Sequence, residues 1–286
     1  MPTGTAPYDA LTAPTCFAET DGRKLAYRTF GDGPPLILCV RFRGVLDVWD
    51  PAFLDRLAAH YQVVTFDYSG LGQSSGTASY EPRALAKDAI DLADALGIER
   101  FALGGWSLGG QAAQALTVLH PGRVTHLVLI GTTPPGKVAR GPEPVFYERA
   151  LKFDNDLADD TVLFFEPESA TSRAAAKASR DRLAERTLSR SPVIPQETYV
   201  RLLKAKAGKD PFNDDGGFRD FLAATDIPIL VISGDHEIVF PVHNWFDVVD
   251  EWQSLRLIVF PQAGHGVHHQ YPESCGDLIH SFIANS

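Results

Sequence analysis

The sequence predicts an α/β fold with a mostly parallel central sheet flanked by helices and interrupted by a helical insertion. Three observations support this fold class. Short continuous apolar runs, typical of strands buried on both faces, alternate with segments of helical periodicity. A Gly-x-Ser-x-Gly motif lies where one such run turns into a helix. Between residues 132 and 224, helical segments punctuated by prolines replace the alternation, which then resumes.

The chain begins with a predicted hairpin. Residues 15–20 and 23–30 are two short alternating runs, and the dipeptide Asp21-Gly22 between them favours a two-residue turn. The continuous apolar run at 36–40 follows, as expected for a central strand.

The α/β alternation continues from there. Pro51 is well placed in the first turn of a helix, and Gly97 ends a later helix in the usual way. The predicted elements up to the insertion are a helix from Pro51, strand 61–67, helix 81–96, strand 101–103, helix 111–120 and strand 124–130. Those after it are strand 227–233, helix 242–251, strand 255–260 and helix 271–283.

The insertion contains two clear helical patterns, at 172–188 and 197–206, and no convincing strand. The predicted domains are therefore a core made of residues 1–131 and 225–286, and an insertion made of residues 132–224.

Composition excludes several classes of partner. The chain has 286 residues and a formal net charge of -10, whereas nucleic acids and anionic membrane surfaces attract basic proteins. The three cysteines, Cys16, Cys39 and Cys275, are too scattered for a disulfide framework or a zinc site. No signal peptide or membrane-spanning run is recognised at the start or elsewhere. We expect a cytoplasmic protein without metal or cofactor.

The motif at 104–110 predicts a nucleophilic serine. A strand before Ser107 and a helix after it are the context of a nucleophile elbow, and Gly105 and Gly109 leave room for strand and helix to approach each other. A serine hydroxyl is a weak nucleophile, so it needs a neighbouring base, and the base needs an acid that orients it.

Both partners are available after later strands. An acidic loop, 234–241, follows the strand 227–233, and His265 lies between two glycines after the strand 255–260. With the serine, acid and histidine in this order, the sequence resembles the α/β-hydrolase fold family over nearly the whole chain outside the insertion. The resemblance implies a serine hydrolase in which the insertion forms a cap over the active site.

The resemblance favours Glu237 as the orienting acid. Family members commonly carry the acid three residues after a glycine and four before a proline, and Glu237 has this spacing from Gly234 and Pro241. Aspartate is more usual at that position, and Asp235 is the competing candidate because it lies nearer the end of the strand.

His265 resembles the family's catalytic histidine in its flanking glycines and in its place near the end of the chain. We expect His268 and His269 to be surface groups. His236 is expected to be structural, with a place along the active site as the alternative.

The oxyanion of an acyl-transfer intermediate needs two backbone donors. The resemblance assigns one to Leu108, the residue after the nucleophile, and the best candidate for the other is Phe42. Relatives usually carry His-Gly at the start of that loop, nine residues before a tryptophan that resembles Trp49. Here the corresponding pair is Val40-Arg41, and arginine cannot adopt every backbone conformation open to glycine.

Arg41 is therefore a candidate substrate-binding residue that could bind a carboxylate or pair with a nearby acid. The ordinary alternatives are a structural pair with Asp47, Asp50 or Asp67, or simple exposure. Trp106, also assigned to the substrate site, is expected to shape or pack it.

The leading hypothesis is a hydrolase that cleaves an ester, lactone or thioester of a small, partly apolar substrate through an acyl-enzyme on Ser107. The alternatives are a C-C bond hydrolase, lyase or cyclase that uses the same residues, and a non-catalytic small-molecule receptor.

The loop 67–74 contains two glycines but does not open directly into a helix, so it indicates no nucleotide site. The sequence leaves the oligomeric state open. It suggests Phe146, Tyr147, Phe153, Phe164 and Phe165 as aromatic lining of the pocket.

Overall fold

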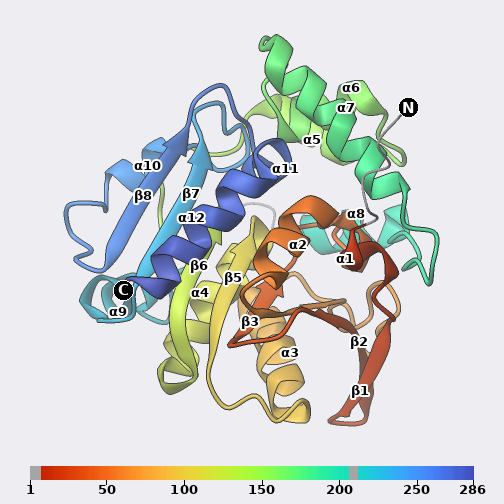
Figure 1. Ribbon diagram of the computed structural model, residues 1–286. Helices are drawn as coiled ribbons and strands as arrows, with labels where there is room; N and C mark the ends of the chain where they lie inside the picture. Colours follow the sequence, from red (N-terminus) through yellow and green to blue (C-terminus); the bar gives the residue numbers. More distant parts are fainter. Residues whose placement is uncertain (1–7, 206–211) are drawn as a thin grey trace.

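The computed structural model describes residues 8–205 and 212–286 (Figure 1). Its centre is an eight-stranded sheet in the order β1-β2-β4-β3-β5-β6-β7-β8. The strand β2 runs antiparallel to β1 and β4, and every other pair is parallel. This arrangement confirms the predicted fold class. The strands are β1 (Cys16–Thr20), β2 (Arg23–Phe30), β3 (Pro35–Cys39), β4 (Gln62–Phe66), β5 (Phe101–Trp106), β6 (Val124–Ile130), β7 (Ile229–Gly234) and β8 (Leu255–Phe260).

The predicted hairpin at the start of the sheet is confirmed. Thr20 pairs with Arg23, which leaves a two-residue loop between β1 and β2. Asp21 and Gly22 in that loop have φ of 48° and 73°. Both values lie in the left-handed region that a type I′ turn requires, which explains the Asp-Gly sequence.

Helices cover both faces of the sheet, with α2 and α12 on one face and α3, α4 and α9 on the other (Figure 1). Strands between two helical layers are buried on both faces, so Ile37 in β3, Leu103 in β5 and Val231 in β7 are fully buried. The core helices are α1 (Asp9–Thr12), α2 (Pro51–Ala58), α3 (Pro82–Ala95), α4 (Leu108–Leu119), α10 (His243–Phe246), α11 (Val267–Gln270) and α12 (Pro272–Ala284), and the 3-10 turns are η1 (Leu46–Val48) and η2 (Pro121–Arg123).

The described residues between β6 and β7 form helices and no strand. The helices α5 to α8 lie beyond the upper end of the sheet in Figure 1, whereas α9 packs against α4 of the core. The assignment of residues 132–224 to one cap domain stays a prediction, and the predicted helix end at Lys206 lies outside the described residues. The helices are α5 (Pro144–Ala150), α6 (Leu157–Phe164), α7 (Ala170–Ala184), α8 (Gln196–Lys204) and α9 (Phe218–Ala224).

The helix predicted at 242–251 is shorter than expected, because only α10, His243–Phe246, is α-helical. The chain continues in turns in which the amides of Val248 and Trp252 donate to carbonyls three and four residues earlier. These turns keep Trp245, Val248 and Trp252 buried on one side, and this spacing produced the helical pattern. Within the described residues no helix is both long and apolar enough to cross a membrane.

Candidate active site

Ser107 lies at the sharp turn between β5 and α4, as the sequence predicts. Its φ of 60° and ψ of -122° are strained for a residue with a side chain. Hydrogen bonds hold this backbone in place. The amide of Ser107 donates to the Ile130 carbonyl at 2.9 Å, and the carbonyl of Ser107 accepts from the Gly110 amide at 2.9 Å and from Thr132 Oγ1 at 2.8 Å.

The glycines of the motif are required by close packing. A Cβ at Gly105 would lie 2.2 Å from the carbonyl oxygen of Gly109, and a Cβ at Gly109 would lie 2.0 Å from the carbonyl oxygen of Cys39. Both distances are far shorter than van der Waals contact. The start of α4 can therefore pass directly over the ends of β5 and β3, which leaves Ser107 above the sheet.

His265 and Glu237 form a buried hydrogen-bonded pair. Nδ1 of His265 lies 2.7 Å from Glu237 Oε2, and both side chains are almost fully buried. The other carboxylate oxygen, Oε1, accepts from the amides of Val239 at 2.8 Å and Phe240 at 3.1 Å. These bonds fix the position of the carboxylate. It accepts a hydrogen bond from the Nδ1–H group, which leaves Nε2 as the ring nitrogen that can take up another proton.

The competing acid, Asp235, has a different contact. Its Oδ1 accepts from the Ala263 amide at 3.2 Å and so ties together the two loops that carry Glu237 and His265. The neighbouring His236 pairs with Glu166 of the insertion at 2.6 Å. The geometry thus places Glu237, and not Asp235, on the imidazole.

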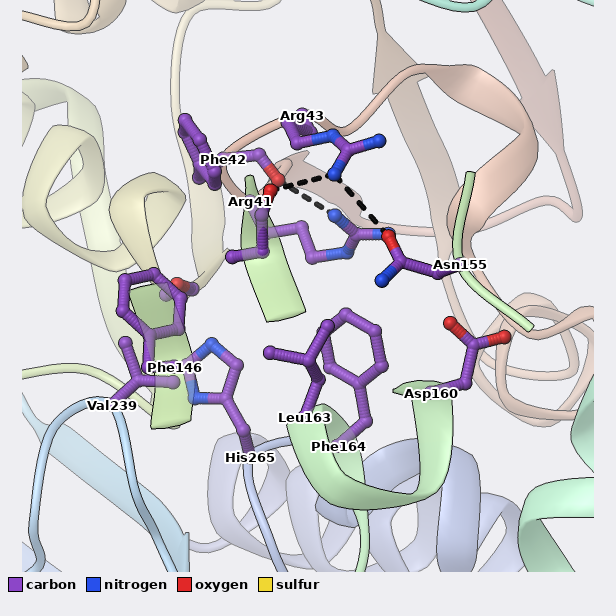
Figure 2. A pocket seen from close by; sticks show the side chains of 12 residues that line it. Arg41, Phe42, Arg43, Phe146, Asn155, Asp160, Leu163, Phe164, Val239 and His265 are labelled. Atoms are coloured by element: carbon purple, nitrogen blue, oxygen red, sulfur yellow. Dashed lines mark hydrogen bonds between the residues drawn. The ribbon is translucent and has the colours of Figure 1, made fainter. Parts of the chain in front are cut away.

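Ser107 and His265 line the same cavity, which has a volume of about 110 Å³ (Figure 2). Of the aromatic residues suggested for this pocket, Phe146 and Phe164 line it and Phe165 is buried. The suggestion is wrong for Tyr147 and Phe153, which are exposed. The lining residues are Arg41, Phe42, Arg43, Ser107, Phe146, Ala150, Asn155, Asp160, Leu163, Phe164, Val239 and His265.

The loop after β3 brings Phe42 to this cavity. In the described part of the chain, neither the amide of Phe42 nor that of Leu108 donates to a protein group. Both amides are therefore free to serve a ligand. The Gly44 amide donates to the Arg41 carbonyl at 2.9 Å, and this turn places Arg43 at a φ of 55°, a value unusual for a residue with a side chain.

Contacts with the insertion hold Arg43 in this conformation, and sequence reasoning did not single it out. Its guanidinium donates to the carbonyls of Ala150 at 2.6 Å, Lys152 at 2.9 Å and Phe153 at 3.0 Å. It also lies 4.1 Å from the centre of the Tyr199 ring. The insertion thus stabilises the loop that carries the Phe42 amide.

Arg41 extends into the cavity (Figure 2). The structural pairs considered for this residue are not formed, because Asp47, Asp50 and Asp67 have other partners. Those partners are Arg28 and Arg186 for Asp47, Arg182 for Asp50, and the amides of Leu46 and Gln73 with Ser191 Oγ for Asp67.

Trp106 lies behind the cavity. It is almost fully buried, and its indole Nε1 donates to the His265 carbonyl at 2.9 Å. This bond supports the loop that carries His265. A direct role of Trp106 in substrate binding stays a prediction.

The expectation that His268 and His269 are surface groups is wrong. The one-turn helix α11 buries both of them, and the Trp106 ring lies 4.5 Å from His268 and 4.9 Å from His269. Ser179 Oγ donates to Asp50 Oδ2 and therefore accepts from Nδ1 of a neutral His269 at 2.9 Å. Burial lowers the pKa of His268 well below its ordinary 6.5 and lowers the pKa of His269 to about 4.

These two histidines predict acid sensitivity. Between pH 6.5 and about 4 they bind protons in the unfolded chain but stay neutral in the folded protein. They therefore leave the free energy of unfolding at its full value above pH 6.5 and reduce it as the pH falls below that value. The loss from His269 alone is about 3 kcal/mol at pH 4. Urea unfolding measured at several pH values checks this.

A His268→Phe variant should show a flatter pH dependence, because the aromatic contacts remain and one titrating group is removed. His120→Gln, on the exposed surface, is the matched control and should leave the slope of the unfolding free energy against pH unchanged. Equal slopes for the wild-type protein and His268→Phe would contradict the assignment.

Comparisons with known proteins identify the family. A sequence model of the alpha/beta hydrolase fold matches residues 34–272. The chain therefore belongs to the α/β-hydrolase fold family. It is 28% identical over 259 residues to a pimeloyl-[acyl-carrier protein] methyl ester esterase of Aeromonas hydrophila, covering 89% of this chain and 97% of the relative.

Other relatives have different activities. A non-heme haloperoxidase of Rhodococcus erythropolis is 26% identical over 258 residues, covering 87% of this chain and 91% of the relative. An alpha/beta hydrolase fold protein from Chitinophaga pinensis superposes with a TM-score of 0.83 at 29% identity, covering 97% and 100% of the two chains. Membership in the family establishes the fold, and it leaves the activity and the substrate to be argued from the site.

Proposed function

We propose that this protein is a serine hydrolase that cleaves a carboxylic ester, lactone or thioester of a small, partly apolar substrate through an acyl-enzyme on Ser107. The observation that carries the proposal is the buried bond between His265 Nδ1 and Glu237 Oε2, next to a cavity that Ser107 also lines. The esterase among the relatives supports the same class of reaction.

In the first half of the proposed reaction, Ser107 Oγ attacks the substrate carbonyl carbon while His265 Nε2 takes the hydroxyl proton. The negative charge moves to the carbonyl oxygen, where the amides of Phe42 and Leu108 donate to it. The bond to the leaving group then breaks, and His265 returns its proton to that group. The product of this half is an ester between the acyl group and Ser107.

Water completes the cycle. His265 Nε2 removes a proton from water as the water oxygen attacks the acyl carbon, and the same proton returns to Ser107 Oγ when the acyl bond breaks. Glu237 remains ionised and stabilises the imidazolium. In this proposal residues 132–224 act as the cap, and the only partner is the small-molecule substrate.

A fluorophosphonate probe tests the proposal, because such probes phosphonylate only activated serines. We expect labelling of the wild-type protein at Ser107, detected by peptide mass spectrometry, and its loss in Ser107→Ala and His265→Ala. Ser281→Ala, on the exposed side of α12, is the matched control and should be labelled normally. A wild-type protein that is neither labelled nor able to hydrolyse activated acyl esters would refute the proposal.

The unusual loop at Arg41, where Val40-Arg41 replaces the usual His-Gly, favours C-C bond hydrolysis, lyase or cyclase chemistry as the second candidate. A receptor without turnover is a third. Labelling without ester turnover would favour the second candidate over the first, since it also uses an activated Ser107. Absence of labelling would favour a receptor.

A further inference from the structure

Arg41 brings a positive charge into the cavity without an acidic partner of its own. Within the described residues its guanidinium makes one hydrogen bond, from Nη1 to the Phe42 carbonyl at 2.7 Å, and its buried Nε has no partner. Burial and the nearby Arg43 lower its pKa to about 10. At neutral pH the guanidinium therefore remains charged and can still donate to a ligand.

Among the described lining residues, the other charged groups near Arg41 are Arg43 and Asp160. The guanidinium of Arg43 donates to neutral carbonyl oxygens and to Asn155 Oδ1, so it adds a second cation at the same end of the cavity. Asp160 is the acidic residue among the described lining residues; it attracts Arg41 electrostatically, but its ion pair is with Arg180 and it forms no hydrogen bond with Arg41. An anion is the missing partner in this part of the site.

The charge lies within reach of the reacting groups. The centre of the Phe164 ring is 4.7 Å from the Arg41 guanidinium and 6.1 Å from the centre of the His265 ring, so both groups lie near the same side chain. In Figure 2, Arg41 and Asn155 lie across the cavity from Val239 and His265. Because the cavity has a volume of only about 110 Å³, a ligand that spans it must be small.

We propose that Arg41 binds a carboxylate at the far end of the acyl group, so that the preferred substrates are esters of short dicarboxylic acids with one acid group free. This inference rests on the proposed function, because it requires the scissile carbonyl to lie at Ser107. The apolar wall formed by Leu163 and Phe164 contacts the methylene groups between the two carbonyl carbons. The free carboxylate accepts from the Arg41 guanidinium, which within the described residues forms no hydrogen bond or ion pair with an acidic side chain.

The test compares two substrates of the same shape. Monomethyl glutarate carries the free carboxylate, and the methyl ester of glutaramic acid carries an uncharged amide in its place. We expect the wild-type kcat/KM to be roughly ten- to a hundredfold higher for the charged ester, as for a charge-assisted hydrogen bond. Arg41→Gln should bring the ratio near one, and Arg41→Lys should retain part of it.

The ratio of the kcat/KM values for the two substrates cancels any general loss of activity caused by the Arg41 variants. Arg173→Gln, which removes one exposed positive charge from α7, is the control and should keep the wild-type ratio. A ratio near one in the wild-type protein, or an unchanged ratio in Arg41→Gln, would overturn the inference while fluorophosphonate labelling still supports the hydrolase. Failure of both labelling and ester turnover would overturn the proposed function and this inference with it.

Discussion

Replacing Glu237 with glutamine is expected to lower kcat roughly 10³- to 10⁴-fold, although the two side chains have the same shape. Oε1 of Glu237 accepts from the amides of Val239 and Phe240, so the glutamine oxygen will take that place and turn its NH₂ group towards His265. An NH₂ group cannot accept from Nδ1. The histidine would then carry its proton on Nε2, where it cannot remove the proton of Ser107.

Steady-state kinetics on an activated acyl ester, with the pH profile of kcat, measures this effect. Asp235→Asn is the matched control, because Asp235 accepts a hydrogen bond from the Ala263 amide and does not contact the imidazole. It is expected to change kcat little. A larger loss in Asp235→Asn than in Glu237→Gln, with both variants folded, would transfer the orienting role to Asp235.

The fold and the candidate triad could be predicted because their signals are local. Ser107 lies in a motif whose glycines are imposed by contacts between β5, α4 and β3. Glu237 and His265 each follow a strand by a few residues, and parallel strands bring their carboxyl ends to one edge of the sheet. Once the strands were recognised, the three residues could be expected to converge.

The features of the site that the sequence did not predict depend on contacts between distant segments. His268 and His269 are polar in the sequence, and only the packing of α11 beneath α7 shows that they are buried. Arg43 adopts a φ typical of glycine because carbonyls more than a hundred residues away bind its guanidinium. No periodicity in the sequence reports such long-range contacts.

Asp50 makes another long-range contact between the core and the insertion. Its fully buried carboxylate binds Arg182 of α7 through two hydrogen bonds of 2.9 Å and 2.7 Å. It also accepts from Ser179 Oγ at 2.7 Å and, at the start of α2, from the Ala52 amide at 3.0 Å. One carboxylate therefore joins the first turn of a core helix to a helix of the insertion.

Asp50→Ala is expected to lower the free energy of unfolding by about 3–5 kcal/mol, because it leaves the Arg182 guanidinium largely buried without its counter-charge and removes the cap of α2. Urea unfolding at pH 8, where His268 and His269 are neutral in both states, isolates this effect from the acid sensitivity. Asp181→Ala is the control, since the Asp181–Lys177 pair on the same helix is exposed. It should cost no more than about 1 kcal/mol.

A second variant separates the lost ion pair from damage to the fold. In the double variant Asp50→Ala with Arg182→Met, the cap of α2 is absent as in Asp50→Ala, but neither member of the pair is charged, and the methionine can fill part of the space of the arginine stem. We expect it to be more stable than Asp50→Ala, because the unpaired cation causes most of the loss. If the double variant were as unstable as Asp50→Ala, the cap of α2 and the bond to Ser179 would be the main contributions of Asp50, and the charge on Arg182 would contribute little.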